Sequence, residues 1–183
     1  MKNSGFSLIE TMIVIALSIS MMTALGFLIY NFNTTSSYEK TFMQSSNSAS
    51  AVMREMATLV VPAHSVLQTH TFSGIPRTSS STALVVGIPS IDNSGNIITN
   101  TYDYAAFYVT GTNMYRVLEA NASSRRTSDT KQLSATINSL TFGYDAATAA
   151  SSTIITVDVQ TQATVKGETL SDHRHEQISL RNH

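Results

Sequence analysis

The most restrictive feature of this chain is an uncharged, apolar segment near its N-terminus. Residues 11–38 contain no Asp, Glu, Lys or Arg, and residues 11–32 are mostly Met, Ile, Val, Leu, Ala and aromatic residues, without a proline. A helix needs about 20 mainly apolar residues to cross a bilayer. The few Ser and Thr side chains in the segment can bond back to the preceding helical turn. The sequence therefore predicts a membrane-spanning helix, which we place at residues 6–32.

An ordinary cleaved signal peptide explains this segment poorly. Such a peptide has an apolar region of 7–15 residues followed by a small-x-small cleavage site. The apolar run here is longer, and residues 25–30 (Leu-Gly-Phe-Leu-Ile-Tyr) offer no such site. A plain signal anchor would explain the apolar run but not the residues that precede it.

Those preceding residues carry a specific pattern. The stretch Gly5-Phe6-Ser7-Leu8-Ile9-Glu10 closely resembles the G-F-[ST]-L-[IL]-E signature of type IV pilins, pseudopilins and competence pilins. The resemblance implies that residues 1–5 are a prepilin leader, removed by a membrane-embedded prepilin peptidase that cuts between Gly5 and Phe6 and methylates the new amine of Phe6. Lys2 in the leader favours a cytoplasmic N-terminus. The resemblance also implies other pilin or pseudopilin subunits as partners, and membrane lipid before assembly.

Glu10 is the residue that separates a filament subunit from a simple anchor. A carboxylate inside a membrane span costs a few kcal/mol, so such residues usually have a function and a partner. Within one chain the Phe6 amine lies about 6 Å along the helix axis from Glu10. In the pilin family the equivalent acid is thought to pair with the amine of a neighbouring subunit. The alternative is that Glu10 is a hydrated residue at the membrane interface.

The helical pattern continues beyond the membrane as far as Val60. Apolar residues recur at intervals close to 3.6 between polar ones, which predicts an amphipathic continuation over residues 33–61 that lays one face on a globular domain. The weak point is Asn31–Ser37, whose residues are poor helix formers and predict a kink or a frayed joint. We therefore expect one helix from about Phe6 to about Val60.

The sequence of residues 62–183 predicts a β-rich globular domain. Ser and Thr make up about a quarter of the chain, which suits strands and polar loops. The predicted strands are Ser65–Phe72, Thr82–Ile88, Tyr102–Thr110, Asn113–Leu118, Ser134–Tyr144, Thr153–Thr164 and Glu176–Leu180. The third and fourth form a hairpin, and loops are expected at Arg77–Ser81, Asp92–Asn96 and Asn121–Thr130. The expected fold class is α+β, with the long helix packed on a mostly antiparallel sheet.

The C-terminal region adds a weaker resemblance within the same family. The runs Leu140–Tyr144, Thr156–Val159 and Ile178–Asn182 resemble the J-type pseudopilins of type II secretion and the W-type minor pilins, which tend to end in a strand closing with Leu-Arg-Asn.

Composition excludes several chemistries. The chain has no cysteine, which excludes disulfides, a cysteine nucleophile and thiolate metal sites. Its net charge is −1, so nothing suggests a strongly cationic nucleic-acid binder. No G-x-S-x-G, H-E-x-x-H or phosphate-binding Gly loop is present. We expect no catalytic residue, no cofactor and no enzymatic activity.

Three polar groups remain as candidate sites. His173 and His175 place two imidazoles on one strand face, but a metal site needs three or four ligands, so an exposed polar edge is favoured and no metal is expected. Asp92–Asn96 superficially resembles a calcium loop but lacks its alternating ligands and distal Glu, which favours a turn. Arg125–Arg126 with Lys131 could touch phosphates, but so few charges give little affinity, and a solvated loop is favoured.

The function expected from this sequence is structural. A minor pilin or pseudopilin would help to start or cap a type IV pilus or a type II secretion pseudopilus. It would be a single-pass protein of the cytoplasmic membrane with its domain in the periplasm or outside the cell. The alternative is a surface adhesin or DNA-uptake pilin with the same anchor, for which Tyr102, Tyr104 and Tyr108 on one strand face would be the place to look. A third hypothesis is an unrelated single-pass membrane protein.

Overall fold

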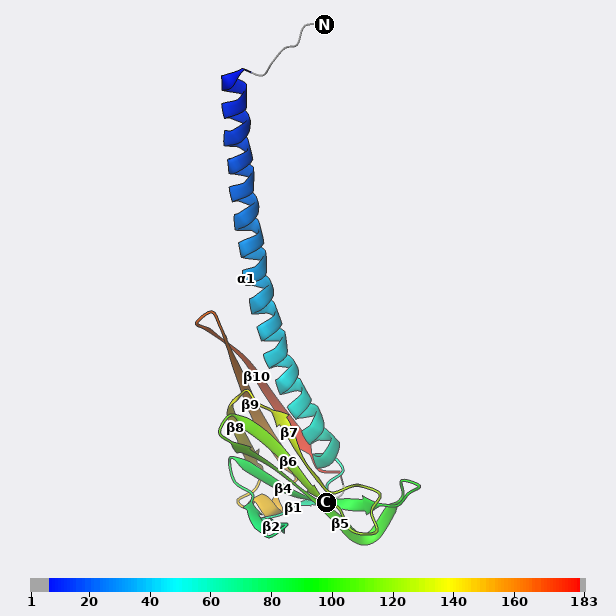
Figure 1. The fold of residues 1–183 in the computed structure, drawn as a ribbon. Coiled ribbons are helices and arrows are strands. Elements are labelled where there is room, and N and C mark those ends of the chain that lie inside the picture. The colour runs from blue at the N-terminus through cyan, green and yellow to red at the C-terminus, as the bar shows by residue number, and fades with distance from the viewer. Residues whose placement is uncertain (1–6, 182–183) are drawn as a thin grey trace. The chain divides into compact units, whose positions relative to one another are not determined.

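The described part of the chain forms one long helix and ten strands. The computed structural model describes residues 7–181, and the chain divides into two compact units, residues 1–40 and 41–183, which are described separately. The elements are α1 (Leu8–Val60), β1 (Ser65–Val66), β2 (Thr69–Phe72), β3 (Ile75–Thr78), β4 (Ala83–Ile91), β5 (Ile97–Thr110), β6 (Asn113–Glu119), β7 (Asp129–Ser134), β8 (Ile137–Tyr144), the 3₁₀ turn η1 (Ala149–Ser151), β9 (Ile154–Val165) and β10 (Glu168–Ser179) (Figure 1). Every strand pairing in the described part of the chain is antiparallel. The predicted α+β class is confirmed.

Helix α1 runs through the stretch of poor helix formers without an interruption. Residues Asn31–Ser37 are all helical. Two of their hydroxyl groups bond back into the helix: Thr34 Oγ1 donates to the Tyr30 carbonyl at 2.8 Å, and Ser37 Oγ donates to the Asn33 carbonyl at 2.7 Å. This back-bonding satisfies side chains that would otherwise compete for the backbone. The expected fraying of the helix at this point is therefore wrong.

The larger sheet has five strands in the order β1-β4-β5-β6-β7. The predicted hairpin of β5 and β6 is confirmed, with Tyr108 opposite Tyr115 and Thr110 opposite Asn113. Gly111 has a φ of 63° at its turn, a conformation that glycine adopts without steric cost. The predicted turn at Asp92–Asn96 joins β4 to β5.

The second sheet has three strands in the order β10-β9-β8. Strands β9 and β10 form a long hairpin in which Val165 pairs with Glu168 and Ile154 pairs with Ser179. The two sheets meet where β8 approaches the start of β4. There Phe142 N–H donates to the Ser81 carbonyl at 2.8 Å, and the Tyr144 hydroxyl lies 3.0 Å from the Ser80 carbonyl.

One apolar core joins both sheets to the second half of the helix. Val52, Met56 and Val60 are completely buried on one face of α1, as expected for an amphipathic helix. They belong to one cluster with Leu84, Val86 and Ile88 of β4, Ala105 and Phe107 of β5, Met114 and Leu118 of β6, Ile137, Leu140 and Phe142 of β8, Ile155, Val157 and Val159 of β9, and Ile178 of β10. The alternating pattern of β9 places its valines in this core, as its sequence predicts.

The helix contacts the sheets differently one turn before this core. Ser45 and Thr161 are both completely buried, and their hydroxyl oxygens lie 2.8 Å apart. Ser48 Oγ donates to Ser134 Oγ at 2.7 Å. Hydroxyl groups rather than apolar side chains therefore join residues 45–48 of α1 to strands β7 and β9.

A smaller apolar cluster lies on the other face of the five-stranded sheet. Phe72 from the β2–β3 hairpin packs there with Val85 of β4 and Ala106 of β5. Because strand side chains alternate between faces, Val85 and Ala106 point away from the main core. The β2–β3 hairpin therefore covers part of the outer face of the sheet.

Several strand bounds differ from the sequence-based expectation. Ser65–Phe72 is not one strand but two, β1 and β2. Strand β3 begins within a segment for which no strand was expected and enters the expected loop at Arg77. Strand β7 occupies the end of the expected Asn121–Thr130 loop and continues to Ser134, and β10 begins at Glu168 rather than Glu176. The first eight residues of β10 are exposed or only half-buried, so pairing with β9 rather than burial defines this strand.

Candidate functional site

The first candidate site is the start of α1, where Ser7 and Glu10 form a reciprocal cap. The Glu10 carboxylate accepts hydrogen bonds from the Ser7 backbone N–H at 2.8 Å and from the Ser7 hydroxyl at 3.0 Å. The Glu10 backbone N–H in turn donates to Ser7 Oγ at 3.3 Å. This is a capping box, in which Ser-x-x-Glu satisfies two N–H groups that a helix start leaves unpaired. Gly5 and Phe6, the predicted processing residues, lie outside the described residues.

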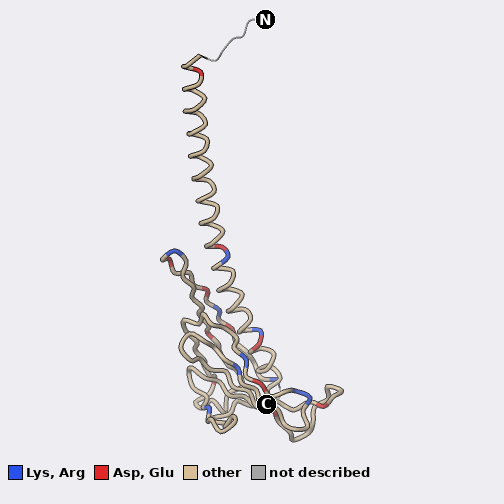
Figure 2. Tube along the Cα trace, viewed as in Figure 1, with Lys and Arg blue, Asp and Glu red and all other residues tan. Residues whose placement is uncertain are grey.

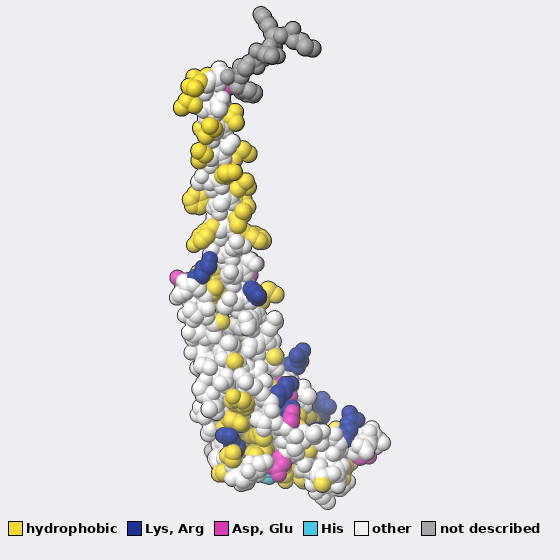
Figure 3. All heavy atoms as spheres, in the orientation of Figure 1, with side chains coloured by type: hydrophobic (Ala, Val, Ile, Leu, Met, Phe, Trp, Pro, Cys, Tyr) yellow, Lys and Arg dark blue, Asp and Glu magenta, His cyan; other side chains and the backbone are white. Residues whose placement is uncertain are grey.

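The segment that follows the cap presents apolar side chains all around the helix. Exposed large hydrophobic residues run from Leu8, 81% exposed, to Phe32 (Figure 3). No charged residue interrupts α1 between Glu10 and Glu39, a stretch that is tan in Figure 2. By length and composition, α1 is the one helix in the described part of the chain that could cross a membrane. An all-round apolar helix of this kind requires lipid or other helices around it.

The few polar side chains in this segment are satisfied within the helix. Ser18 Oγ donates to the Val14 carbonyl at 2.8 Å, and Thr23 Oγ1 donates to the Ile19 carbonyl at 2.9 Å. These bonds fulfil the expectation from the sequence. The hydroxyls of Thr11 and Ser20 bond in the same way, so every Ser and Thr hydroxyl of residues 11–32 is paired within the helix and none opposes insertion into lipid.

The tyrosines of β5 make contacts inside the domain. Tyr104 stacks on His70 of β2 with ring centroids 3.9 Å apart, and Tyr108 stacks on Tyr115 at 5.7 Å. The guanidinium of Arg77 in β3 lies 3.7 Å from the centre of the Tyr108 ring, within cation–π range. The β2–β3 hairpin therefore uses this aromatic face as its own packing surface.

The two histidines of β10 share one carboxylate. Asp158 Oδ1, on the neighbouring strand β9, lies 2.8 Å from His175 Nδ1 and 3.2 Å from His173 Nε2. Hydrogen bonding from His175 is the main cause of a lowered Asp158 pKa. Residues 7–181 contain no group of three or more His, Asp or Glu side chains arranged to hold a metal ion. The arrangement is a polar cross-strand contact at an exposed sheet face.

The Asp92–Asn96 segment forms a turn with hydrogen bonds among its own residues. Asp92 Oδ1 accepts hydrogen bonds from the backbone N–H groups of Ser94 at 2.8 Å and Asn96 at 2.9 Å. The bond from Asn96 is the main cause of an Asp92 pKa below its usual value. Its carboxylate thus stabilises a turn, as aspartates commonly do.

The expected basic cluster is divided between two different ion pairs. Arg126 Nη1 lies 2.6 Å from Asp103, and Lys131 Nζ lies 3.1 Å from Glu55 of α1. Only Arg125 of the three is without a salt bridge in the described structure. A phosphate-binding patch does not form from these residues.

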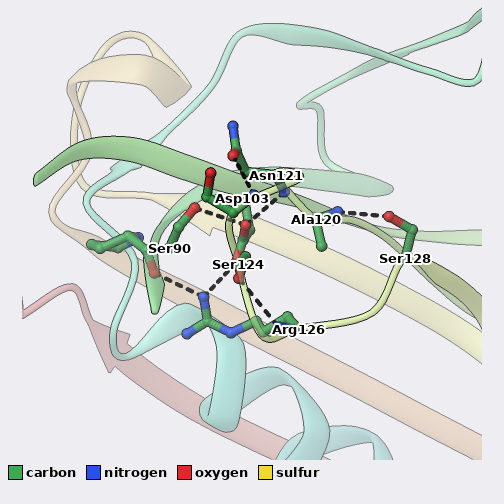
Figure 4. Close-up of polar contacts among 9 residues, drawn as sticks. Ser90, Asp103, Ala120, Asn121, Ser124, Arg126 and Ser128 are labelled. Atoms are coloured by element: carbon green, nitrogen blue, oxygen red, sulfur yellow. Dashed lines mark hydrogen bonds and ion pairs between the residues drawn. The ribbon is translucent and has the colours of Figure 1, made fainter. Parts of the chain in front are cut away.

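Asp103 is a buried charge that the sequence analysis missed. Its residue is 0% exposed, and its carboxylate accepts four hydrogen bonds, from Ser90 Oγ, the Asn121 backbone N–H, Ser124 Oγ and Arg126 Nη1 (Figure 4). Burial alone would raise the pKa of Asp103, but these bonds together, that from Arg126 foremost, hold the pKa below its usual value. The signal in the sequence was an acidic residue at an inward-facing position of β5.

The Asp103 contacts fix a loop. Residues 120–128 connect β6 to β7, and three of the four donors to Asp103 come from this loop. Arg126 Nη1 also donates to the Pro89 carbonyl at 2.8 Å, and Arg125 N–H donates to the Ile91 carbonyl at 2.8 Å. The loop is therefore attached to β4 and β5 while most of its side chains remain exposed.

Comparisons of this chain with protein-family models, with curated proteins and with solved structures find no match. The arguments about function therefore depend on the residues and geometry described above.

Proposed function

We propose that this chain is a pilin-like structural subunit, a minor pilin or pseudopilin that takes part in starting or capping a type IV pilus or a type II secretion pseudopilus. The observation that carries the proposal is the composition of α1. Its first part is apolar and exposed on all sides, and its last part is amphipathic and packs on antiparallel sheets. One helix thus provides two segments: one is suited to lipid or to a bundle of like helices, and the other packs against the sheets of a globular domain.

The sequence before α1 supports the same proposal. Gly5-Phe6 directly precedes the Ser7–Glu10 cap, and the leader is short and positively charged at Lys2. Prepilin peptidase would remove residues 1–5 and methylate the amine of Phe6. The N-terminus would lie in the cytoplasm and the domain in the periplasm or outside the cell, with the mature subunit passing from the membrane into a filament of pilin subunits.

The alternative of an adhesin or DNA-uptake pilin gains no specific support from the described residues. The aromatic face that would suit a ligand packs against the β2–β3 hairpin. Of the three basic residues that would suit DNA, Arg126 pairs with Asp103 and Lys131 pairs with Glu55. Neither feature leaves a continuous surface for sugar or phosphate.

The proposal is tested by the mass of the mature protein. The full-length chain is expressed with and without an active prepilin peptidase, and intact masses are compared. With peptidase, the protein should lose residues 1–5 and gain one methyl group. Recovery of the unprocessed chain despite an active peptidase, checked with a known prepilin in the same cells, would contradict the proposal.

A matched pair of variants controls this experiment. Gly5→Val places a branched side chain at the cleavage site and should block processing. Gly26→Val changes a glycine inside α1 with no heavy atom within 4 Å of an added Cβ, and processing should continue. Equal processing of both variants would show that Gly5 is not the recognised residue.

A further inference from the structure

The tripeptide pattern Asn-x-Ser/Thr, with x other than Pro, occurs twice in this sequence. The two copies are Asn33-Thr34-Thr35 and Asn121-Ala122-Ser123. This pattern is the acceptor for N-linked glycosylation of exported proteins. The pattern alone does not distinguish the two sites, but the structure places them in different local conformations.

Asn33 lies inside the continuous helix α1. Its carbonyl accepts a hydrogen bond from Ser37 Oγ at 2.7 Å, and the hydroxyl of Thr34 bonds back to the Tyr30 carbonyl. Helical backbone directs the side chains of residues i and i+2 to different sides. The amide of Asn33 and the hydroxyl of Thr35 are therefore not presented together.

Asn121 lies in the exposed loop between β6 and β7. Its side-chain Oδ1 accepts a hydrogen bond from the Ser123 backbone N–H at 3.0 Å, which folds Asn121 and Ser123 into one tight turn. Its own backbone N–H is held by Asp103 at 2.8 Å. The side-chain nitrogen Nδ2 makes no hydrogen bond in the described structure, and Figure 4 shows this side chain directed away from the Asp103 carboxylate.

The residues around Asn121 also suit a modifying enzyme. Asn121, Ala122 and Ser123 are all exposed. Glu119, two residues before the asparagine, is directed toward the domain instead, with Oε2 buried and 3.6 Å from His70 Nε2. The residues that the loop presents to an enzyme are therefore those of the tripeptide itself.

We propose that Asn121 is an acceptor site for an N-linked oligosaccharide and that Asn33 is not. The donor class is an oligosaccharide linked through pyrophosphate to a membrane lipid. Asn121 Nδ2 forms a bond to the anomeric carbon of the first sugar, the bond from that carbon to the pyrophosphate oxygen breaks, the lipid pyrophosphate leaves, and Nδ2 loses one proton. The site requires the domain to lie outside the cytoplasm, as the proposed function places it, but it does not require filament assembly.

The test uses the purified full-length chain in detergent with a bacterial oligosaccharyltransferase and its lipid-linked oligosaccharide. Intact mass should rise by one glycan, and peptide mapping should locate the glycan on Asn121. Asn121→Gln and Ser123→Ala should each lower the modified fraction at least tenfold. Ser123→Thr, which keeps the hydroxyl, and Asn33→Gln, which removes the helical copy, should both be modified like the unaltered chain.

Three results would overturn the proposal. The first is an unmodified chain in a reaction that glycosylates a synthetic acceptor peptide. The second is a glycan on Asn33. The third is modification of Asn121 only after the chain has been unfolded with urea and diluted, because the folded loop would then not be the acceptor. Since no step involves the prepilin peptidase, failure here leaves the proposed function unaffected, and failure of processing leaves this assay unaffected.

Discussion

The backbone N–H of Ser7 donates a 2.8 Å hydrogen bond to the carboxylate of Glu10. The acid that resembles the assembly residue of pilins therefore also caps its own helix. Because a cap at this position contributes about 1 kcal/mol to helix stability, loss of Glu10 would affect two properties at once. A simple Glu10→Leu substitution cannot separate a role in capping from a role in pairing with a neighbour.

The first prediction separates these roles. Glu10→Gln retains a side-chain oxygen for the Ser7 cap and removes the charge, whereas Ser7→Ala removes the cap hydroxyl and retains the charge. If Glu10 pairs with the Phe6 amine of a neighbouring subunit, crosslinking to partner subunits should fall in Glu10→Gln and Glu10→Leu and persist in Ser7→Ala. Processing and membrane insertion, scored on the same samples, should be unchanged in all three.

The opposite pattern is equally informative. Normal crosslinking of Glu10→Gln together with loss in Ser7→Ala would mean that Glu10 serves the helix start alone. Normal crosslinking of Glu10→Leu would leave Glu10 as a hydrated interface residue. Glu10→Asp, one methylene shorter, should be partly impaired under the pairing hypothesis.

The second prediction concerns the folded unit. A truncated chain that starts at Asn33 should be soluble and monomeric, because it lacks the apolar segment and retains every helix residue of the core. Size-exclusion chromatography with light scattering and a β-type circular dichroism spectrum would check this. A chain that starts at Pro62 should not fold, since it lacks Val52, Met56 and Val60, which are completely buried. Equal folding of both chains would contradict the observed core.

The third prediction tests the contact of α1 with the sheets. Met56→Ala in the Asn33 truncation should lower the free energy of unfolding by about 2–5 kcal/mol, because it removes a fully buried side chain and leaves a cavity. Phe42→Ala removes a larger side chain from the same helix, but Phe42 is 46% exposed, and its loss should cost much less. Urea denaturation of the two variants gives the comparison, and a larger effect of Phe42→Ala would refute the assigned helix face.

The fourth prediction concerns the buried ion pair. Asp103→Asn leaves Arg126, whose side chain is 18% exposed, without its charged partner, and should lower the free energy of unfolding by about 3 kcal/mol. Arg126→Gln should have a similar effect, because it leaves the Asp103 charge unpaired. The double variant should cost less than the sum of the two single variants, since the residues share one interaction. Additive losses would mean that the pair is not coupled.

The lowered pKa of Asp103 in the folded protein predicts that stability depends on pH. Its folded pKa lies below its ordinary value, so its stabilising contribution is fully present above the unfolded pKa of about 3.9 and is lost as the pH falls through the folded pKa. The melting temperature of the unaltered truncation should therefore fall more steeply below about pH 4 than that of Asp103→Asn. Parallel acid profiles would contradict this assignment.

The helix and the buried strands were predictable because their apolar residues follow a regular period. The valines of β9 alternate in the sequence as they do in the structure. Strand β7 was missed because Asp129 and Lys131 are typical loop residues. In the structure both are engaged in ion pairs, Asp129 with Arg116 and Lys131 with Glu55, which fix an exposed edge strand. Such a strand is defined by its neighbours, and local sequence carries little of that information.

The candidate site was predictable in part. The pilin-like motif indicated Glu10. The Ser-x-x-Glu capping pattern, which lies inside the same six residues, was not predicted. Asp103 was missed because its donors are distant in sequence, with Arg126 23 residues away. A buried charge of this kind becomes recognisable only when the fold brings its partners together.

The hydroxyl contacts of Ser45 and Ser48 imply an uneven mechanical linkage between helix and sheets. Water can replace a hydroxyl hydrogen bond at little net cost, whereas separating Val52, Met56 and Val60 from the core exposes apolar area. A pulling force applied to the domain through residue 41 would therefore break the contacts of Ser45 with Thr161 and of Ser48 with Ser134 first. The apolar contacts beyond Ala49 would break last. About two turns of helix, residues 41–48, would therefore separate from the sheets before the apolar core is disrupted.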